Sequence, residues 1–257
     1  MEPGKDRISD LSGYLYRMQK TMIDKMFFID KIFEPIECIV DFGCANGELI
    51  KMLQYFFDEY RYIGYDLSDK MIAEAKKNVP KARFYTDWDS IDADFEHSLL
   101  NISSVIHEVY SYCPDEEIEL FWHRVFDSGF RYITIRDMMV SEDTERPASE
   151  HDLRCVCSHN GFSTQLSDYE GVWGNIRTEK QLIHYLLKYS YTQNWEREVR
   201  ENYLGLSAER LLKRIPDNYH ITYKEHYTLP YIAWQVKRDF GIELKTPTHI
   251  KLVLERI

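Results

Sequence analysis

The chain has 257 residues, of which 44% are hydrophobic and 29% are charged, with 32 Lys and Arg against 43 Asp and Glu. These proportions indicate a folded globular protein with a sizeable core, and they exclude a disordered, collagen-like or disulfide-framed chain. The formal net charge of −11 disfavours non-specific binding of nucleic acid over the whole surface. Basic residues slightly outnumber acidic ones from residue 174 onward, so this last third could still contact an anionic substrate.

The sequence carries no sign of a membrane partner or of export. No run approaches 18 apolar residues, and the start, MEPGKDRISD, lacks the apolar middle of a signal peptide. We therefore expect a cytoplasmic protein. Its five cysteines are an odd number spread along the chain, which favours free thiols over a disulfide framework. The sequence does not indicate an oligomeric state.

Helices and strands alternate over the first half of the chain. Apolar residues at mostly four-residue spacing predict an amphipathic helix over 12–33. Strands are expected at 38–42, 62–65, 82–86, 98–105 and 132–135, and helices at 48–57, 68–77 and 115–126, with Ser68 as an N-cap. Such alternation predicts a parallel sheet that is covered by helices on both faces.

The second half of the chain has a different pattern. Residues 141–176 carry turn formers without sustained periodicity, which predicts a long loop that acts as a flap or an insertion. Helical spacing returns at 179–189, 195–203 and 207–214, followed by a strand at 219–227, a helix at 231–239 and a strand at 249–255. No linker demands a domain boundary, so we expect one domain over 1–257.

The turn after the first strand reads DFGCANG, from Asp41 to Gly47, and Asp66 closes the second strand. Small residues let backbone N–H groups approach a ligand, and a carboxylate at the next strand end suits a ribose diol. A dinucleotide site has G-x-G-x-x-G for its pyrophosphate, whereas here Asp41 would repel that group and would suit an ammonium or a sulfonium. The site therefore favours a nucleoside ligand over the dinucleotide NAD.

At these residues the sequence resembles the class I S-adenosylmethionine-dependent methyltransferases. The resemblance covers residues 37–137 well and the final strand weakly. It implies a doubly wound, mostly parallel seven-stranded α/β sheet whose last strand is antiparallel. By this resemblance the cofactor, S-adenosylmethionine, is held by Asp41, Gly43, Cys44, Ala45, Gly47, Asp66, Leu67, Asp87, Trp88 and Ser103. Ala45 departs from the family pattern, because Gly often fills that place.

The resemblance also divides the chain by role. We expect a lid helix at 12–33, a cofactor-binding core at 37–137, a helical substrate-selecting insertion at 141–217 and closing elements at 218–257. The expected reaction is methyl transfer to an oxygen or nitrogen atom of a small or medium polar substrate, leaving S-adenosylhomocysteine. Two alternatives stay open: an RNA or nucleotide methyltransferase, and a module that binds the cofactor without catalysis.

The segment after the fourth strand is the place to look for catalytic residues, because open parallel sheets bind ligands at the carboxyl ends of their strands. His107 could accept a proton and Glu108 could orient it; alternatively both residues are structural. We expect Tyr14, Arg17, Tyr110 and Arg136 to contact the substrate. Arg136 suits a carboxylate or phosphate, or else an ion pair with Asp137.

Two further patterns bear on metal and nucleic-acid binding. His151, Cys155, Cys157 and His159 suggest zinc ligands, but their spacing is more compressed than in the usual paired-ligand sites, so we expect no metal there. The aromatic and basic last third, from Tyr185 to Trp234, could stack nucleobases. Packing of these aromatic residues in the interior is the favoured explanation, so a nucleic-acid partner is possible but not favoured.

Overall fold

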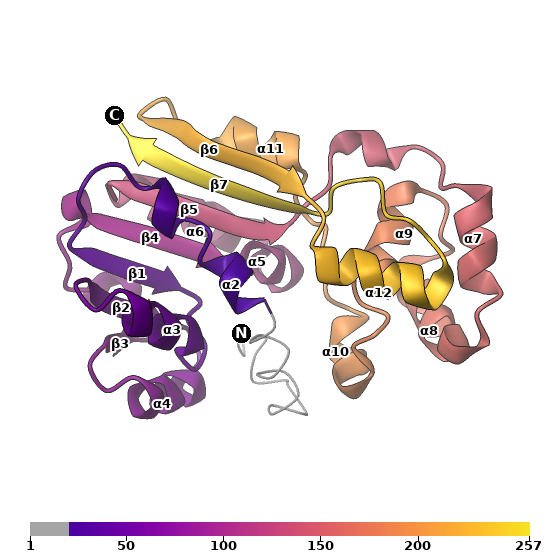
Figure 1. Cartoon of the computed structure of the whole chain (residues 1–257), viewed down its shortest axis with the longest axis horizontal. Helices are drawn as coiled ribbons and strands as arrows, with labels where there is room; N and C mark the ends of the chain where they lie inside the picture. The colour runs from indigo at the N-terminus through magenta and orange to yellow at the C-terminus, as the bar shows by residue number, and fades with distance from the viewer. Residues whose placement is uncertain (1–20) are drawn as a thin grey trace.

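The structure is a computed structural model that describes residues 21–257, and it combines a seven-stranded sheet with a helical lobe (Figure 1). The strand order is β3-β2-β1-β4-β5-β7-β6. Neighbours from β3 to β5 are parallel, whereas β7 is antiparallel to both β5 and β6. The strands are β1 (Cys38–Phe42), β2 (Arg61–Tyr65), β3 (Arg83–Tyr85), β4 (Ser98–Ser103), β5 (Tyr132–Met138), β6 (Tyr219–Tyr227) and β7 (His249–Arg256). The predicted fold class, including the antiparallel last strand, is confirmed.

Apolar clusters cover both faces of the sheet, as expected for central parallel strands. Ile39 of β1 packs with α3 (Glu48–Phe56) and α4 (Asp69–Asn78), while its neighbour Val40 packs with α6 (Asp115–Asp127) and α11 (Ala208–Arg214) on the opposite face. The short helix α5 (Ile106–Tyr112) follows β4. Ser68 caps α4 as predicted, because its Oγ accepts a hydrogen bond from Met71 N at 3.3 Å.

The helical lobe lies beyond the carboxyl ends of β1, β4 and β5 (Figure 1). Its own core is aromatic, built around Tyr169, Tyr185 and Tyr189 with Val236. The elements are η5 (Glu142–Glu145), α7 (Glu150–Cys157), η6 (Asn160–Phe162), α8 (Ser163–Trp173), α9 (Glu179–Leu186), η7 (Thr192–Asn194), α10 (Trp195–Glu198) and α12 (Pro230–Phe240). The lobe therefore combines most of the segment between β5 and β6 with the helix between β6 and β7.

The prediction of a long loop at 141–176 is wrong, since α7 and α8 occupy most of it. Tyr169 is the one buried residue of α8, so no apolar stripe was there to be detected. Helix α7 begins instead at a local cap, in which Ser149 accepts a hydrogen bond from Asp152 N. The helix expected at 195–203 is also shorter, because α10 ends at Glu198.

The helix predicted at 12–33 is not continuous. Residues 12–20 lie outside the described residues, and the remainder contains α2 (Met22–Lys25) and the 3-10 turn η2 (Ile29–Lys31). The chain turns between them and buries Phe28 completely in the cluster around Ile39. None of the helices in residues 21–257 is both long and apolar enough to cross a membrane.

Candidate active site

The turn after β1 has the backbone geometry of a ligand cradle. Gly43, Ala45 and Gly47 have positive φ angles of 74°, 47° and 79°. The N–H groups of Gly43 and Cys44 donate to the carbonyl oxygen of Tyr65, at 2.8 and 3.0 Å. A Cβ atom added to Gly43 would lie 2.6 Å from Cγ2 of Val105, so no larger residue fits there without displacement. The turn is therefore fixed against the second strand and packs closely on Val105.

Asp66 ties this turn to the start of α4. Its carboxylate is 3% exposed and accepts hydrogen bonds from Ala45 N at 2.8 Å and from Ser68 N at 3.0 Å. Leu67 beside it is 62% exposed, so its apolar side chain is available to pack against a flat ring. Asp66 and Leu67 together offer a carboxylate that suits a ribose and an apolar side chain that suits a nucleobase.

The other predicted cofactor residues are placed differently. Asp41 is buried, and its Oδ1 accepts from Asn101 Nδ2 at 2.7 Å. Cys44 is buried, whereas Asp87 is exposed and accepts from Asp89 N and Ser90 Oγ. Trp88 needs a correction as a ligand contact, because its ring is 6% exposed and packs against Phe42 and Tyr65 in the core.

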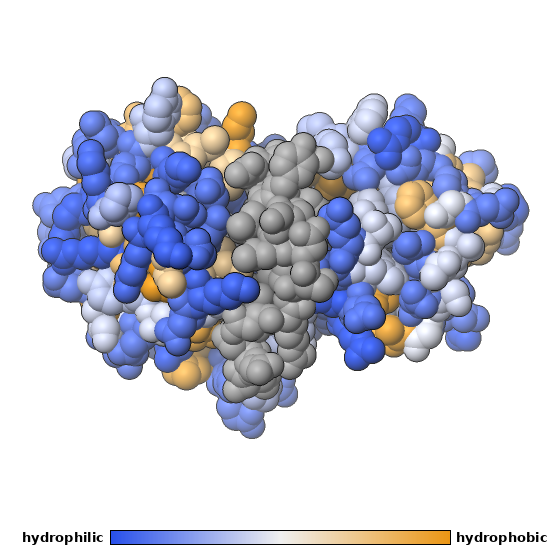
Figure 2. Space-filling model, turned by 90° about the horizontal axis from the view of Figure 1, so that it is seen from below, coloured by the Kyte–Doolittle hydropathy of each residue, from blue (hydrophilic) through white to orange (hydrophobic). Residues whose placement is uncertain are grey.

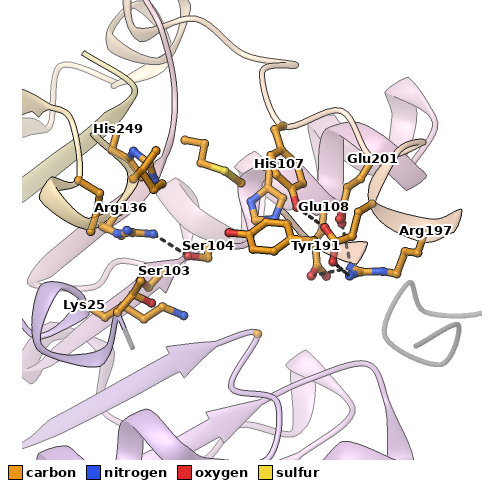
Figure 3. A pocket seen from close by; sticks show the side chains of 17 residues that line it. Lys25, Ser103, Ser104, His107, Glu108, Arg136, Tyr191, Arg197, Glu201 and His249 are labelled. Atoms are coloured by element: carbon orange, nitrogen blue, oxygen red, sulfur yellow. Dashed lines mark hydrogen bonds and ion pairs between the residues drawn. The ribbon is translucent and has the colours of Figure 1, made fainter. Parts of the chain in front are cut away.

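A cavity of about 140 Å³ opens where β4 and β5 end, facing the helical lobe (Figure 3). Gly43 lines it, so the cavity begins at the cradle turn. Ser103 and Arg136 come from the strand ends, His107 from α5, and Arg197 and Glu201 from the segment around α10. Residues from distant parts of the chain therefore form one charged cavity, which we call the strand-end cavity.

His107 forms a buried ion pair with Asp137, with 2.7 Å between Nδ1 and Oδ1. Asp137 also caps α5, because its Oδ2 accepts from Val105 N at 2.9 Å and from Ile106 N at 2.7 Å. Burial lowers the pKa of His107, but the charge and hydrogen bond of Asp137 outweigh burial and raise that pKa to about 9. His107 is therefore protonated near neutral pH, which favours binding over acceptance of a proton.

An arginine and three glutamates form the opposite wall, and sequence reasoning missed most of them. Nη2 of Arg197 lies 3.2 Å from an oxygen of Glu108 and 2.8 Å from one of Glu201, and its Nη1 lies 3.6 Å from Glu198. Burial raises the pKa of Glu201 to about 7 against the opposing charge of Arg197. The alternation of charges from Glu196 to Glu201 resembled a solvated surface and gave no signal for this site.

His107, Glu108 and Glu201 also have donor atoms within 4.8 Å of one another, a spacing that could suit a metal ion. Two features oppose a metal. Arg197 already bridges both carboxylates, and the protonated imidazole of His107 has no free lone pair on either ring nitrogen. The carboxylates of Glu108 and Glu201 are therefore paired with Arg197.

Arg136 lies inside β5, which extends three residues beyond the predicted end. It is 3% exposed and pairs with Asp24 rather than with Asp137, through Nε at 2.9 Å from Oδ2. Its Nη1 donates to Ser104 Oγ at 2.9 Å, and Ser104 holds a positive φ of 61°. A strained residue at the carboxyl end of a central strand is typical of functional sites.

Tyr110 and the histidines and cysteines around α7 do not line the strand-end cavity. The hydroxyl of Tyr110 accepts from Trp122 Nε1 at 3.2 Å, which turns its ring toward α6, so its prediction as a substrate contact needs a correction. Tyr14 and Arg17 lie outside the described residues. His151 and Cys155 share one side of α7, with 3.7 Å between Nε2 and Sγ, whereas the ring of His159 stacks on Phe162. Four tyrosines of the last third, Tyr185, Tyr189, Tyr203 and Tyr219, are buried, as the packing explanation predicts.

Known proteins with a similar sequence or fold include methyltransferases. Residues 39–128 match the family described as "Methyltransferase domain". No curated protein sequence matches the chain. Among solved structures, the plantazolicin methyltransferase BamL, in complex with a triazolic desmethylPZN analog and SAH, is 13% identical, with 99% of this chain and 91% of that chain covered and a TM-score of 0.57.

A second solved structure has the same fold. It is a geranyl diphosphate C-methyltransferase from Streptomyces coelicolor A3(2), which is 12% identical, with 98% of this chain and 87% of that chain covered and a TM-score of 0.52. At such identities the likeness concerns the fold. Residues 39–128 match a methyltransferase domain, and the whole chain has the fold of the class I S-adenosylmethionine-dependent methyltransferases.

Proposed function

We propose that this methyltransferase moves the methyl group of S-adenosylmethionine to an oxygen or nitrogen atom of a small or medium polar acceptor. The observation that carries the proposal is the continuity of two spaces. Gly43 belongs to the cradle turn and also lines the strand-end cavity. A cofactor on the turn would therefore present its reactive end to a cavity that is closed by charged side chains.

The residues at the turn suit the cofactor. The left-handed residues Gly43 and Ala45 shape the turn that would hold the amino-acid tail, with Ser103 beside it at the end of β4. A carboxylate such as that of Asp66 accepts several hydrogen bonds and so suits ribose hydroxyls, and Leu67 offers an apolar face to adenine. Bound there, the cofactor supplies a methyl group already activated by its sulfonium.

The cavity residues then have to align an acceptor atom and receive its proton. His107 is the predicted catalytic base, but as a protonated group it is better suited to donate a hydrogen bond to the acceptor. Glu201 is the better match for a proton acceptor, because its pKa of about 7 lies near neutral pH. We propose that Glu108 orients Arg197 and, through it, Glu201.

Two alternatives differ in what they require of the cavity. An RNA or nucleotide acceptor would bring phosphates toward a wall that carries Glu108, Glu198 and Glu201, which disfavours it. A module that only binds the cofactor would not need a closed charged cavity next to the cradle. The proposed function and the two alternatives predict different labelled products, so one assay can distinguish them.

The assay incubates the purified chain with methyl-labelled S-adenosylmethionine and, separately, a small-molecule extract, an RNA fraction or buffer. We expect label in the small-molecule fraction. Label in RNA alone, lost steeply with added salt, would support the RNA alternative. Binding of S-adenosylhomocysteine without label in any fraction would leave the non-catalytic module. Asp66→Asn should abolish most uptake, while Asp69→Asn, the same change on an exposed residue of α4, serves as the matched control.

A further inference from the structure

Two neighbouring polar atoms of the strand-end cavity have no hydrogen-bond partner. Nη2 of Arg136 and Oγ of Ser103 are both buried and unpaired. These two residues face each other across the β4 and β5 pair, in register, and both line the cavity (Figure 3). The other nitrogens of the Arg136 guanidinium are used, since Nε donates to Asp24 and Nη1 to Ser104.

An unpaired N–H of a guanidinium at 3% exposure is costly in a folded protein. His249, also on the cavity wall, is kept neutral because burial and the charge of Arg136 lower its pKa well below the ordinary value. Asp24 is shared between Arg136 and Lys251, with 2.7 Å between its Oδ1 and the Lys251 Nζ. Nη2 of Arg136 therefore lacks an acceptor, and Arg136 lines the cavity.

From this we infer that the methyl acceptor carries a carboxylate, which accepts a hydrogen bond from Arg136 Nη2 and lies beside Ser103. The inference rests on the proposed function and narrows its substrate class. A carboxylate fits better than a phosphate because Asp24 already offsets part of the charge of Arg136, leaving room for one negative charge. The glutamates of the opposite wall would repel a dianion more strongly than a monoanion.

The cofactor has a carboxylate of its own, in its methionine part, and that is the second source of the same chemistry. Arg136 lies on β5, two strands away from β1, which carries the cradle turn. Adjacent strands are about 4.8 Å apart, so the separation is roughly 10 Å. This distance places Arg136 on the acceptor side of the cavity, with Ser103 of β4 between it and the cradle turn.

The first test uses the unmodified protein with the labelled cofactor. A small-molecule extract is divided, and one part is treated with acidic methanol, which converts carboxylates to methyl esters. We expect label uptake from the esterified part to fall at least about tenfold and to return after mild alkaline hydrolysis, because a charged hydrogen bond of this kind contributes that much. Phosphatase treatment of another part should leave uptake unchanged. Uptake that survives esterification, or that is lost with phosphatase, would overturn the inference.

The second test separates the two sources. Calorimetry compares S-adenosylhomocysteine with methylthioadenosine, which lacks the amino-acid part, on the wild type and on Arg136→Lys. We expect Arg136→Lys to leave both affinities within about threefold and to lower uptake from the extract about tenfold. A loss of affinity for S-adenosylhomocysteine alone would assign Arg136 to the cofactor and overturn the inference. Absence of label from every untreated extract would instead be a failure of the proposed function.

Discussion

The buried pair of His107 and Asp137 makes a prediction about stability against pH. The folded protein holds the pKa of His107 at about 9, above its ordinary value of 6.5. The imidazolium therefore stabilises the fold fully below about pH 6.5, and this contribution is lost as the pH rises through about 9. A rise of this size corresponds to about 3 kcal/mol of unfolding free energy, at 1.36 kcal/mol per pKa unit.

Replacing His107 by Gln removes the titrating group and keeps a side chain that can donate to Asp137. Urea unfolding followed by fluorescence, at several values between about pH 6 and pH 9.5, measures the difference between the two proteins. The wild type should be favoured by about 3 kcal/mol more at the acid end than at the alkaline end. The test uses the difference in unfolding free energy between the two proteins, because other groups titrate in the same range. Burial lowers the pKa of Lys188 to about 7, so the contribution of Lys188 to stability changes with pH in the opposite direction.

His123→Gln is the matched control, since His123 forms an exposed pair with Asp127 on α6 and should follow the wild type at every pH. Parallel pH curves for wild type and His107→Gln would refute the reasoning. They would mean that His107 is neutral in the folded protein, and a role for it as a base near neutral pH would then be favoured.

Three further predictions follow from the same geometry. Asp66→Asn should weaken binding of S-adenosylhomocysteine roughly tenfold or more in calorimetry, because the ribose diol loses a charged acceptor, and an unchanged affinity would remove Asp66 from the site. Gly43→Ala should cost roughly 1–3 kcal/mol of stability through its φ of 74° and the contact with Val105, whereas Gly171→Ala on α8, where nothing lies within 4 Å, should not destabilise. A chelator should leave the melting temperature and label uptake unchanged; a loss restored by one divalent metal would show that His107, Glu108 and Glu201 bind it.

The sheet was predictable because its signals are local. The β-branched run at 38–42, the glycine turn and the capped helix at Ser68 each follow from neighbouring residues, and β1, β2 and α4 appear where the sequence indicates them. The family resemblance added the seven-stranded sheet and its antiparallel last strand, which no local pattern encodes.

The lobe and the cavity wall were not predictable in this way. Helix α8 exposes most of its residues, so tertiary packing of Tyr169 decides its structure rather than an apolar stripe. Arg197 meets Glu108 from 89 positions away, a contact that depends on how the lobe folds back over the sheet. Tyr110 shares a helix with His107, yet its hydroxyl contacts Trp122 of α6, a tertiary contact that the sequence does not indicate.

The most direct test of the central claim is a calorimetric titration of the purified protein with S-adenosylhomocysteine. The geometry of the turn after β1, with Asp66 and Leu67 beside it, predicts saturable heat at one site per chain. Absence of heat for this compound and for S-adenosylmethionine, together with binding of NADH, would contradict it.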